Sequence, residues 1–322
     1  MNIKKIGLTA LAGSLVATSA FAGEMSVAGS ASINVEHTNG GAADSGKTFS
    51  MGNQLTFSGS GELDNGLTVS LSFVIDQNDD STTSAGAVKS ANTGSPFDSH
   101  SVTISSETLG TLNFAGEGGS SATTALDATA AGDIWDQFDD EGGLEPSGVG
   151  SGDNMFMYTT PSLMDGLTVK ASFLPSRAGK DSAVGYSATY TGVEGLTVSL
   201  AQGDSNSVGN TEDASVLKAS YAWGPVTVSY SDYEYDAAGT SSDDDVTSYK
   251  LSYTVSDEIS ISYGTEDLDE GTKSSEYESI SASYTAGGMT ITGTMSDATD
   301  IDGTTTATED RERWALSASF AF

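Results

Sequence analysis

The stretch NGLTVSLSF, residues 65–73, alternates apolar and hydroxyl-bearing side chains without a break. Its apolar residues, every second one from Leu67 to Phe73, share one face of an extended chain, and the serine and threonine residues share the other. Near copies, DGLTVKASF at residues 165–173 and EGLTVSLAQ at residues 194–202, begin in the same way, with an acidic or amide residue and a glycine that suits a tight reversal. The repeat predicts antiparallel strands that follow short turns.

The same alternation continues along the chain, and no helical period competes with it over a long window. Turn signals divide the sequence into sixteen predicted strands, at residues 24–37, 48–63, 67–78, 98–106, 111–116, 154–160, 167–175, 182–191, 196–202, 214–223, 226–235, 246–255, 259–267, 273–284, 289–298 and 311–322. Short turns alternate with longer, mostly acidic loops, which we place at residues 38–47, 79–97, 117–153, 176–181, 203–213, 236–245, 268–272 and 299–309. This order predicts an all-β, antiparallel up-and-down β-barrel with short periplasmic turns at one end and longer extracellular loops at the other.

A barrel of sixteen strands encloses a lumen too wide for side chains to fill. The polar face of each strand must therefore line water, and the apolar face must meet a lipid bilayer. Aromatic residues in the apolar phase near strand ends agree with the girdles of a transmembrane barrel. They are Tyr221, Trp223, Tyr253, Tyr284, Trp314, Phe320 and Phe322.

The first 22 residues read as a secretory signal: Lys4 and Lys5, an apolar run over residues 6–20, and an A-x-A site that predicts cleavage after Ala22. A single membrane anchor fits less well, because the apolar run is short and interrupted by polar residues and glycine. Residues 23–322 then form the barrel. They contain no cysteine, and their 10 basic and 45 acidic residues give a net charge of −35, which argues against nucleic acid as a partner.

Four features carry a resemblance to a known family: the signal KKIGLTALAGSLVATSAFA, the repeated GLTV segments, the long insertion after the fifth strand, and the closing RWALSASFAF. In these the whole mature chain resembles a Gram-negative general diffusion porin of the alphaproteobacterial type. The resemblance implies a homotrimer in the outer membrane, surrounded by lipid and lipopolysaccharide, that lets ions and small hydrophilic solutes diffuse passively. It also implies that the third loop, residues 117–153, folds into the lumen and narrows it, and that Phe322 is the signal recognised by the barrel-assembly machinery.

The charges of the predicted pore are unequal. Acidic candidates for the constriction are Glu117, Asp127, Asp133, Asp136, Asp139, Asp140 and Glu141, with Glu145 further along the loop. Basic candidates for the pore wall, in the polar phase of later strands, are Lys170, Lys218, Lys250, Arg311 and Arg313. Carboxylates in a narrow aqueous path favour cations. The resemblance implies a basic wall opposite the acidic loop, but the predicted second to sixth strands carry no arginine or lysine well inside the span, so we expect a cation-selective pore.

Two further predictions concern partners. Small residues at outward positions of the first two strands, Gly29, Ala31, Gly59 and Gly61, favour a subunit contact there. Asp297, Asp300 and Asp302 in DATDIDG (residues 297–303) are candidate calcium ligands, and EDLDEG (residues 266–271) resembles this segment. Solvated acidic turns are the alternative interpretation of both. We expect no other cofactor.

Nothing in the sequence selects an enzymatic site. Neither His37 nor His100 has partners at metal-ligand spacing, and no serine or aspartate is singled out as part of a catalytic set. Two non-enzymatic alternatives stay open: a secreted or cell-surface β-rich structural protein or adhesin, and a solute-specific channel. For a sugar channel, Trp135 and Phe138 would be a fragment of an aromatic track.

Overall fold

The computed structural model describes residues 25–40, 46–77, 97–141, 143–177, 179–204, 212–237, 243–303 and 310–322. The predicted signal, residues 1–22, lies outside these ranges. So do several side chains within them, among which are Asp127, Asp139, Asp140 and Glu141. No helix in the described part of the chain is long and apolar enough to cross a membrane.

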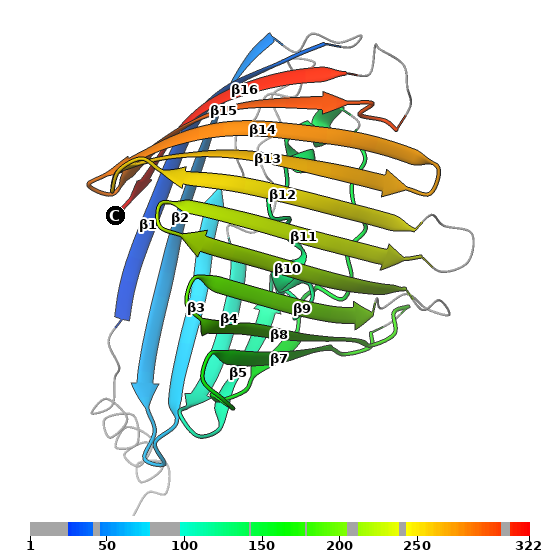
Figure 1. Cartoon of the computed structure of the whole chain (residues 1–322). Helices are drawn as coiled ribbons and strands as arrows, with labels where there is room; N and C mark the ends of the chain where they lie inside the picture. The colour runs from blue at the N-terminus through cyan, green and yellow to red at the C-terminus, as the bar shows by residue number, and fades with distance from the viewer. Residues whose placement is uncertain are drawn as a thin grey trace, which may run out of the picture.

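Sixteen antiparallel strands close into one barrel, in which each strand pairs with its neighbours in sequence and β1 pairs with β16 (Figure 1). The strands are β1 (Met25–Asn39), β2 (Gly46–Glu62), β3 (Thr68–Gln77), β4 (Phe97–Ser106), β5 (Gly110–Glu117), β6 (Met155–Thr159), β7 (Leu167–Leu174), β8 (Ala183–Val193), β9 (Leu196–Asp204), β10 (Asp213–Trp223), β11 (Val226–Asp236), β12 (Asp244–Thr254), β13 (Ile259–Glu270), β14 (Lys273–Ala286), β15 (Met289–Thr299) and β16 (Arg311–Ala321). All sixteen predicted strands are confirmed, because alternation and turn signals are local properties of the sequence.

One predicted loop is wrong. The segment at residues 268–272 is a tight turn, because β13 runs to Glu270 and β14 starts at Lys273, and the intervening Gly271 takes a positive φ of 61°. The alternation in fact continues through this segment. Leu268 is fully buried on the inward face, whereas Asp267 and Asp269 point outward. The loop was predicted because the outward residues of this part of the strand are acidic.

The outward face carries a broad apolar band between two rows of aromatic side chains. Near the turns lie the predicted Tyr221, Trp223, Tyr253, Tyr284, Phe320 and Phe322, all exposed. A second row, toward the loops, consists of Tyr186, Tyr230, Tyr249, Tyr263 and Trp314. Tyr230 and Tyr249 are direct cross-strand neighbours with ring centroids 5.2 Å apart. Two aromatic rows with an apolar band between them match the two interfaces of a bilayer.

The barrel closes at the last residue. The backbone N–H of Phe322 donates to the carbonyl of Gly29 at 3.0 Å, and the N–H of Gly29 donates to the carbonyl of Phe322 at 2.7 Å. A Cβ atom at Gly29 would lie 2.4 Å from the Phe322 ring. Gly29 therefore leaves room for the C-terminal ring of the same chain, which is a second explanation for a small residue here besides the predicted subunit contact.

We expect Gly29→Val to displace the Phe322 ring and to destabilise closure of the barrel by about 1 kcal/mol, the low end of the cost of overpacking, because the ring is exposed and can turn away. The matched control is Gly59→Val, because a Cβ atom at Gly59 would lie 3.6 Å from the Met25 side chain, an ordinary contact. The measurement is the urea midpoint of the folded barrel, read from its heat-sensitive mobility on gels. Equal midpoints for the two variants would contradict the packing role of Gly29.

Candidate pore constriction

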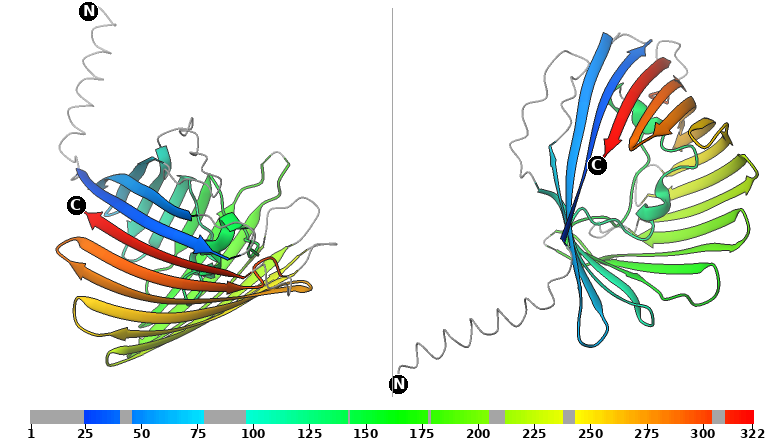
Figure 2. Two further views of the ribbon diagram at one scale, coloured as in Figure 1. Left: turned by 90° about the horizontal axis from the view of Figure 1, so that it is seen from above. Right: turned by 90° about the vertical axis from the view of Figure 1, so that its left-hand side faces the viewer.

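The connection between β5 and β6, residues 118–154, enters the barrel, and we call it the third loop. Figure 2 (right) shows it in blue-green inside the ring of strands. It contains a short helix, α2 (Thr124–Asp127), and a 3-10 helix, η2 (Trp135–Glu141). Its two arms are joined by hydrogen bonds. The N–H of Gly152 donates to the carbonyl of Gly119 at 3.0 Å, and the hydroxyl of Ser121 donates to the carbonyl of Val149 at 3.3 Å. The predicted insertion of the third loop into the lumen is confirmed.

An apolar seat holds the third loop against the wall. Its buried side chains Ile134, Phe138, Leu144 and Val149 pack against inward residues near the loop ends of the later strands. These are Ala201, Ala214, Val216, Tyr233, Tyr235, Val246, Leu268, Tyr277 and Ala298 on the strands, together with Ile301 in the turn after β15. Phe138 is 0% exposed, with its ring centroid 5.9 Å from that of Tyr277, so it is not available to a passing solute as part of an aromatic track.

This seat corrects the expectation that the inward face is polar throughout. In β11, Ser229 faces inward near the turn, but Tyr233 and Tyr235 face inward near the loop, while Asp232 and Glu234 face outward. The apolar and polar faces of the strand therefore exchange sides along its length. The signal was present in the sequence SDYEYD, residues 231–236, where the apolar residues change phase.

Two inward glycines let the loop approach the wall closely. A Cβ atom at Gly264 would lie 2.7 Å from the Cβ atom of Ala131. A Cβ atom at Gly203 would lie 2.3 Å from the hydroxyl oxygen of Thr123, a fully buried residue. Any larger residue at these positions would lift the loop off its seat.

A buried carboxylate fastens the middle of the loop. Glu266 of β13 is 0% exposed and accepts hydrogen bonds from the hydroxyl of Thr129 and from the N–H of Trp135, the latter at 3.0 Å. Burial of a carboxylate without such donors would be costly. The sequence singled out Glu266 only as part of EDLDEG, the segment compared with a calcium site, because its partners lie more than a hundred residues away in the chain.

Two of the predicted wall lysines bond to the loop backbone. The ammonium of Lys218 donates to the carbonyl of Ala128, and that of Lys250 donates to the carbonyl of Ala131 at 3.2 Å. Wall serines complete the attachment, with the hydroxyl oxygen of Ser248 accepting from the N–H of Ala131 at 2.9 Å. These lysines therefore position the loop as well as contributing charge.

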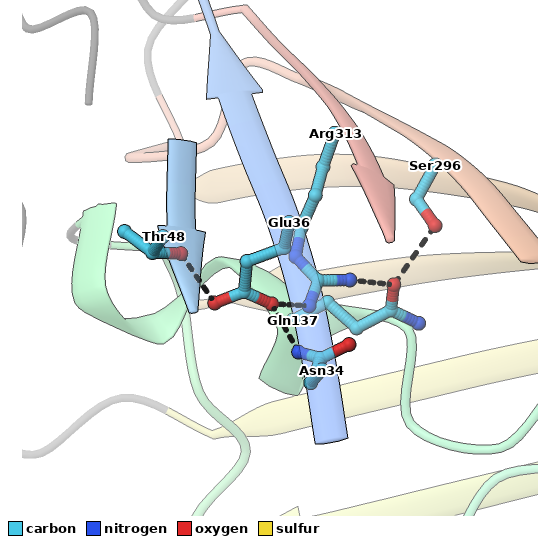
Figure 3. Close-up of polar contacts among 6 residues, drawn as sticks. All are labelled: Asn34, Glu36, Thr48, Gln137, Ser296 and Arg313. Carbon is cyan, nitrogen blue, oxygen red and sulfur yellow. Dashed lines mark hydrogen bonds and ion pairs between the residues drawn. The ribbon is translucent and has the colours of Figure 1, made fainter. Parts of the chain in front are cut away.

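Figure 3 shows how η2 is tied to the seam of the barrel. The network contains Asn34, Glu36, Thr48, Gln137, Ser296 and Arg313. Arg313 pairs with the carboxylate of Glu36 and donates to the side-chain oxygen of Gln137 at 2.9 Å. The positive charge of Arg313 is thus compensated by a glutamate of β1 that the sequence analysis did not single out.

The predicted acidic residues take different places. Asp136 is exposed at the start of η2, and Glu145 is exposed further along the loop. Asp133 accepts a hydrogen bond from the N–H of Thr129 at 2.8 Å and takes a positive φ of 52°, so its carboxylate closes a turn. Glu117 lies 3.6 Å from the ring of His100. The backbone of Asp127, Asp139, Asp140 and Glu141 lies in α2 and η2, but their side chains lie outside the described part.

The remaining basic residues lie on the wall. Lys170 is half-buried at an inward position of β7, beside Ser187. Arg311 is buried at the loop end of β16, where it donates to the carbonyl of Asp310 at 3.1 Å. Opposite the third loop, the inward positions of β1–β6 that the structure describes carry no lysine or arginine, and serine and threonine dominate there.

The candidate calcium ligands are not gathered. Within the described residues, no three histidine or acidic side chains lie close enough together to hold a metal ion. Asp297 points outward from β15, whereas Asp300 and Asp302 belong to the following turn. In EDLDEG, Glu266 points inward and Asp267 outward, because side chains alternate along a strand.

A closed sixteen-stranded barrel with an apolar outer band and a loop folded into its lumen defines a transmembrane channel of the bacterial outer membrane. The family model described as Gram-negative porin matches residues 7–279, and the chain belongs to this family. It is therefore an outer-membrane porin and not an enzyme, and the alternative of a secreted structural protein or adhesin does not hold.

Solved porins share the fold at low sequence identity. An anion-selective porin from Comamonas acidovorans is 16% identical, with a TM-score of 0.62 and coverage of 93% of this chain and 99% of that one. An engineered variant of the Rh. blastica porin is 14% identical, with a TM-score of 0.68, and a porin refined at 1.8 Å resolution is 21% identical, with a TM-score of 0.64; each match covers 93% of this chain and 100% of the other. No curated protein matches the chain.

We expect Glu266→Ala to loosen the third loop, because the Thr129 hydroxyl and the Trp135 N–H lose their acceptor at a cost of about 1–3 kcal/mol. Single-channel recordings should show greater current noise in the open state, and a protease should cut the loop faster. Glu145→Ala is the matched control, because it removes an exposed carboxylate from the loop itself. Identical noise in the two variants would contradict the anchoring role of Glu266.

Lys250→Met should also increase the noise, since one hydrogen bond from a charged group to the loop, worth about 1.5–3 kcal/mol, is lost. Lys170→Met removes the same charge from the inward face, but Lys170 makes no hydrogen bond or ion pair with the described residues of the third loop. It should therefore change ion selectivity alone. If both variants change only selectivity, Lys250 acts as a wall charge and not as a support.

Proposed function

We propose that this porin is a cation-selective channel for the passive diffusion of ions and small hydrophilic solutes. The observation that carries the proposal is the absence of lysine and arginine from the described inward positions of β1–β6, the wall opposite the third loop. The exposed carboxylate of Asp136 lies on the loop itself. A solute that passes between these two surfaces meets hydroxyl groups on one side and a carboxylate on the other.

The positive groups on the remaining wall differ in how much charge they leave in the lumen. Arg313 is paired with Glu36, so its charge is compensated, whereas Lys218 and Lys250 bond to neutral backbone carbonyls of the loop and keep their charge, as does Lys170. Charges in the lumen act on ions mainly within the screening distance of ~8 Å at physiological salt. We place the solute path between Asp136 and the hydroxyl-lined wall of β1–β6, where a negative charge concentrates cations.

The fold does not set the selectivity. The porin from Comamonas acidovorans, which has the same fold, is described as anion-selective. Selectivity thus depends on the side chains that line the narrow part of each channel, and here those side chains favour cations. A track for a specific sugar is not favoured, because Phe138 is buried beneath the loop.

The assembled state is also part of the proposal. We infer a homotrimer whose subunit contact uses outward positions of the early strands, among them Ala31, Gly59 and Gly61. Small residues allow two barrels to approach closely, whereas the later strands present the aromatic rows to lipid and lipopolysaccharide. Recognition of Phe322 by the barrel-assembly machinery agrees with its place at the closing seam.

The test is the reversal potential of the reconstituted channel across a potassium chloride gradient. The unmodified protein should give a potential of the sign expected for cation preference. Asp136→Lys should lower the ratio of cation to anion permeability, calculated from that potential, several-fold. Asp165→Lys, at an exposed position in a short turn, makes the same change of charge away from the constriction and should leave the potential nearly unchanged. An unselective or anion-selective unmodified channel would contradict the proposal.

A further inference from the structure

A groove of about 630 Å³ crosses the outward side of β7–β11, on the other side of the wall from the third loop. Its floor is a row of direct cross-strand neighbours that starts apolar and ends in a carboxylate: Val169, Ala188, Leu200, Leu217 and Asp232. Glu234 lines the same acidic end. The groove therefore has an apolar part and a charged part.

Side-chain size explains the hollow. Ala188 is a short side chain between taller neighbours, since Leu200 beside it is 55% exposed and Tyr186, two residues earlier on the same outward face, is 58% exposed. The depression is thus built into the strands and does not depend on any loop.

The groove lies where the outward face changes from apolar to polar. Its floor row holds the last apolar residues of β9 and β10 before the loops, Leu200 and Leu217. The next outward row on these strands consists of Gln202 and Ser215, which are direct neighbours of each other. This is the depth at which the acyl chains of a bilayer give way to head groups.

On the described strands around it, the charged end of the groove has acids and hydroxyl groups for neighbours. Tyr230 donates to Asp232 at 2.7 Å and Ser215 to Glu234 at 3.4 Å, and these bonds orient both carboxylates. The cross-strand neighbour of Glu234 is Asp245, another acid. No lysine or arginine occupies an outward position of β8–β12 within the described residues. Like charges on facing positions are unfavourable, so a positive group placed here would be stabilised.

We propose that the groove binds an amphiphile with one long alkyl chain and a cationic ammonium head group. The chain lies on Val169, Ala188, Leu200 and Leu217, and the head group contacts Asp232 and Glu234. Neighbouring strands are about 4.8 Å apart, so the four apolar residues span about 14 Å and the whole row to Asp232 about 19 Å, a path that an alkyl chain with its head group can follow. Charge complementarity selects the head group, because an anionic one would meet two carboxylates. The inference does not depend on the ion selectivity of the pore.

The experiment is photolabelling of the full mature protein in neutral maltoside micelles. One probe is a hexadecyltrimethylammonium that carries a diazirine in its chain, and the other is the hexadecyl sulfate with the same chain and diazirine. Mass spectrometry of the peptides should show several-fold more labelling of β8–β11 by the ammonium probe. Asp232→Asn combined with Glu234→Gln should abolish the difference, and Ala188→Trp should reduce ammonium labelling several-fold by filling the hollow.

The matched control combines Asp267→Asn with Glu276→Gln, which removes an outward acidic pair of β13 and β14 that are direct neighbours away from the groove. This variant should label like the unmodified protein. Equal labelling by the two probes, or unchanged labelling after loss of Asp232 and Glu234, would overturn the proposal. An equal loss of ammonium labelling in the control variant would also overturn it, because it would indicate that the probe is attracted to outward acids in general. Sulfate labelling that appears only with added calcium would assign the groove to an anionic amphiphile bridged by the metal.

Discussion

The structure depends on pairing the first strand with the last. Inside a bilayer no water is present to bond to an open strand edge, so a sheet that crosses it is stable only when closed. Here the closure extends to the last residue, where Phe322 and Gly29 exchange backbone hydrogen bonds and the ring of Phe322 covers the glycine. Every other feature, including the lumen and the position of the third loop, requires that this seam holds.

A closed barrel of sixteen strands has a lumen that the side chains of its wall cannot fill, so another part of the chain must narrow it. The third loop meets this demand by lying on a prepared surface, apolar where its own side chains are buried and polar where its backbone needs partners. Glu266 and Lys250 bond to the loop, while Gly264 leaves room for it. The same charged groups therefore fix where the loop lies in the lumen, and with it the position of the constriction.

The outward surface is divided into an apolar zone and an acidic zone. Apolar side chains between two aromatic rows meet the lipid, and acidic residues such as Asp232, Asp245 and Asp267 face outward above the loop-side row. At this height the acidic residues face outward and the apolar residues face inward, because the apolar and polar faces of these strands exchange sides along their length. As a result, the third loop packs on apolar side chains inside the barrel, and acidic side chains surround the barrel outside.

Alternation and turn residues are local, and from them the sequence by itself determined the closed barrel and its strands, whereas the insertion of residues 117–153 followed from the family resemblance. The sequence also determined that Lys170, Lys218 and Lys250 share the inward phase. The tertiary structure alone decided what those residues contact, because the partners come from distant segments: Lys250 meets Ala131, Glu266 meets Thr129, and Arg313 meets Glu36. Periodicity shows the side of the wall that a residue faces, but only the folded loop shows whether it meets water, lipid or protein there.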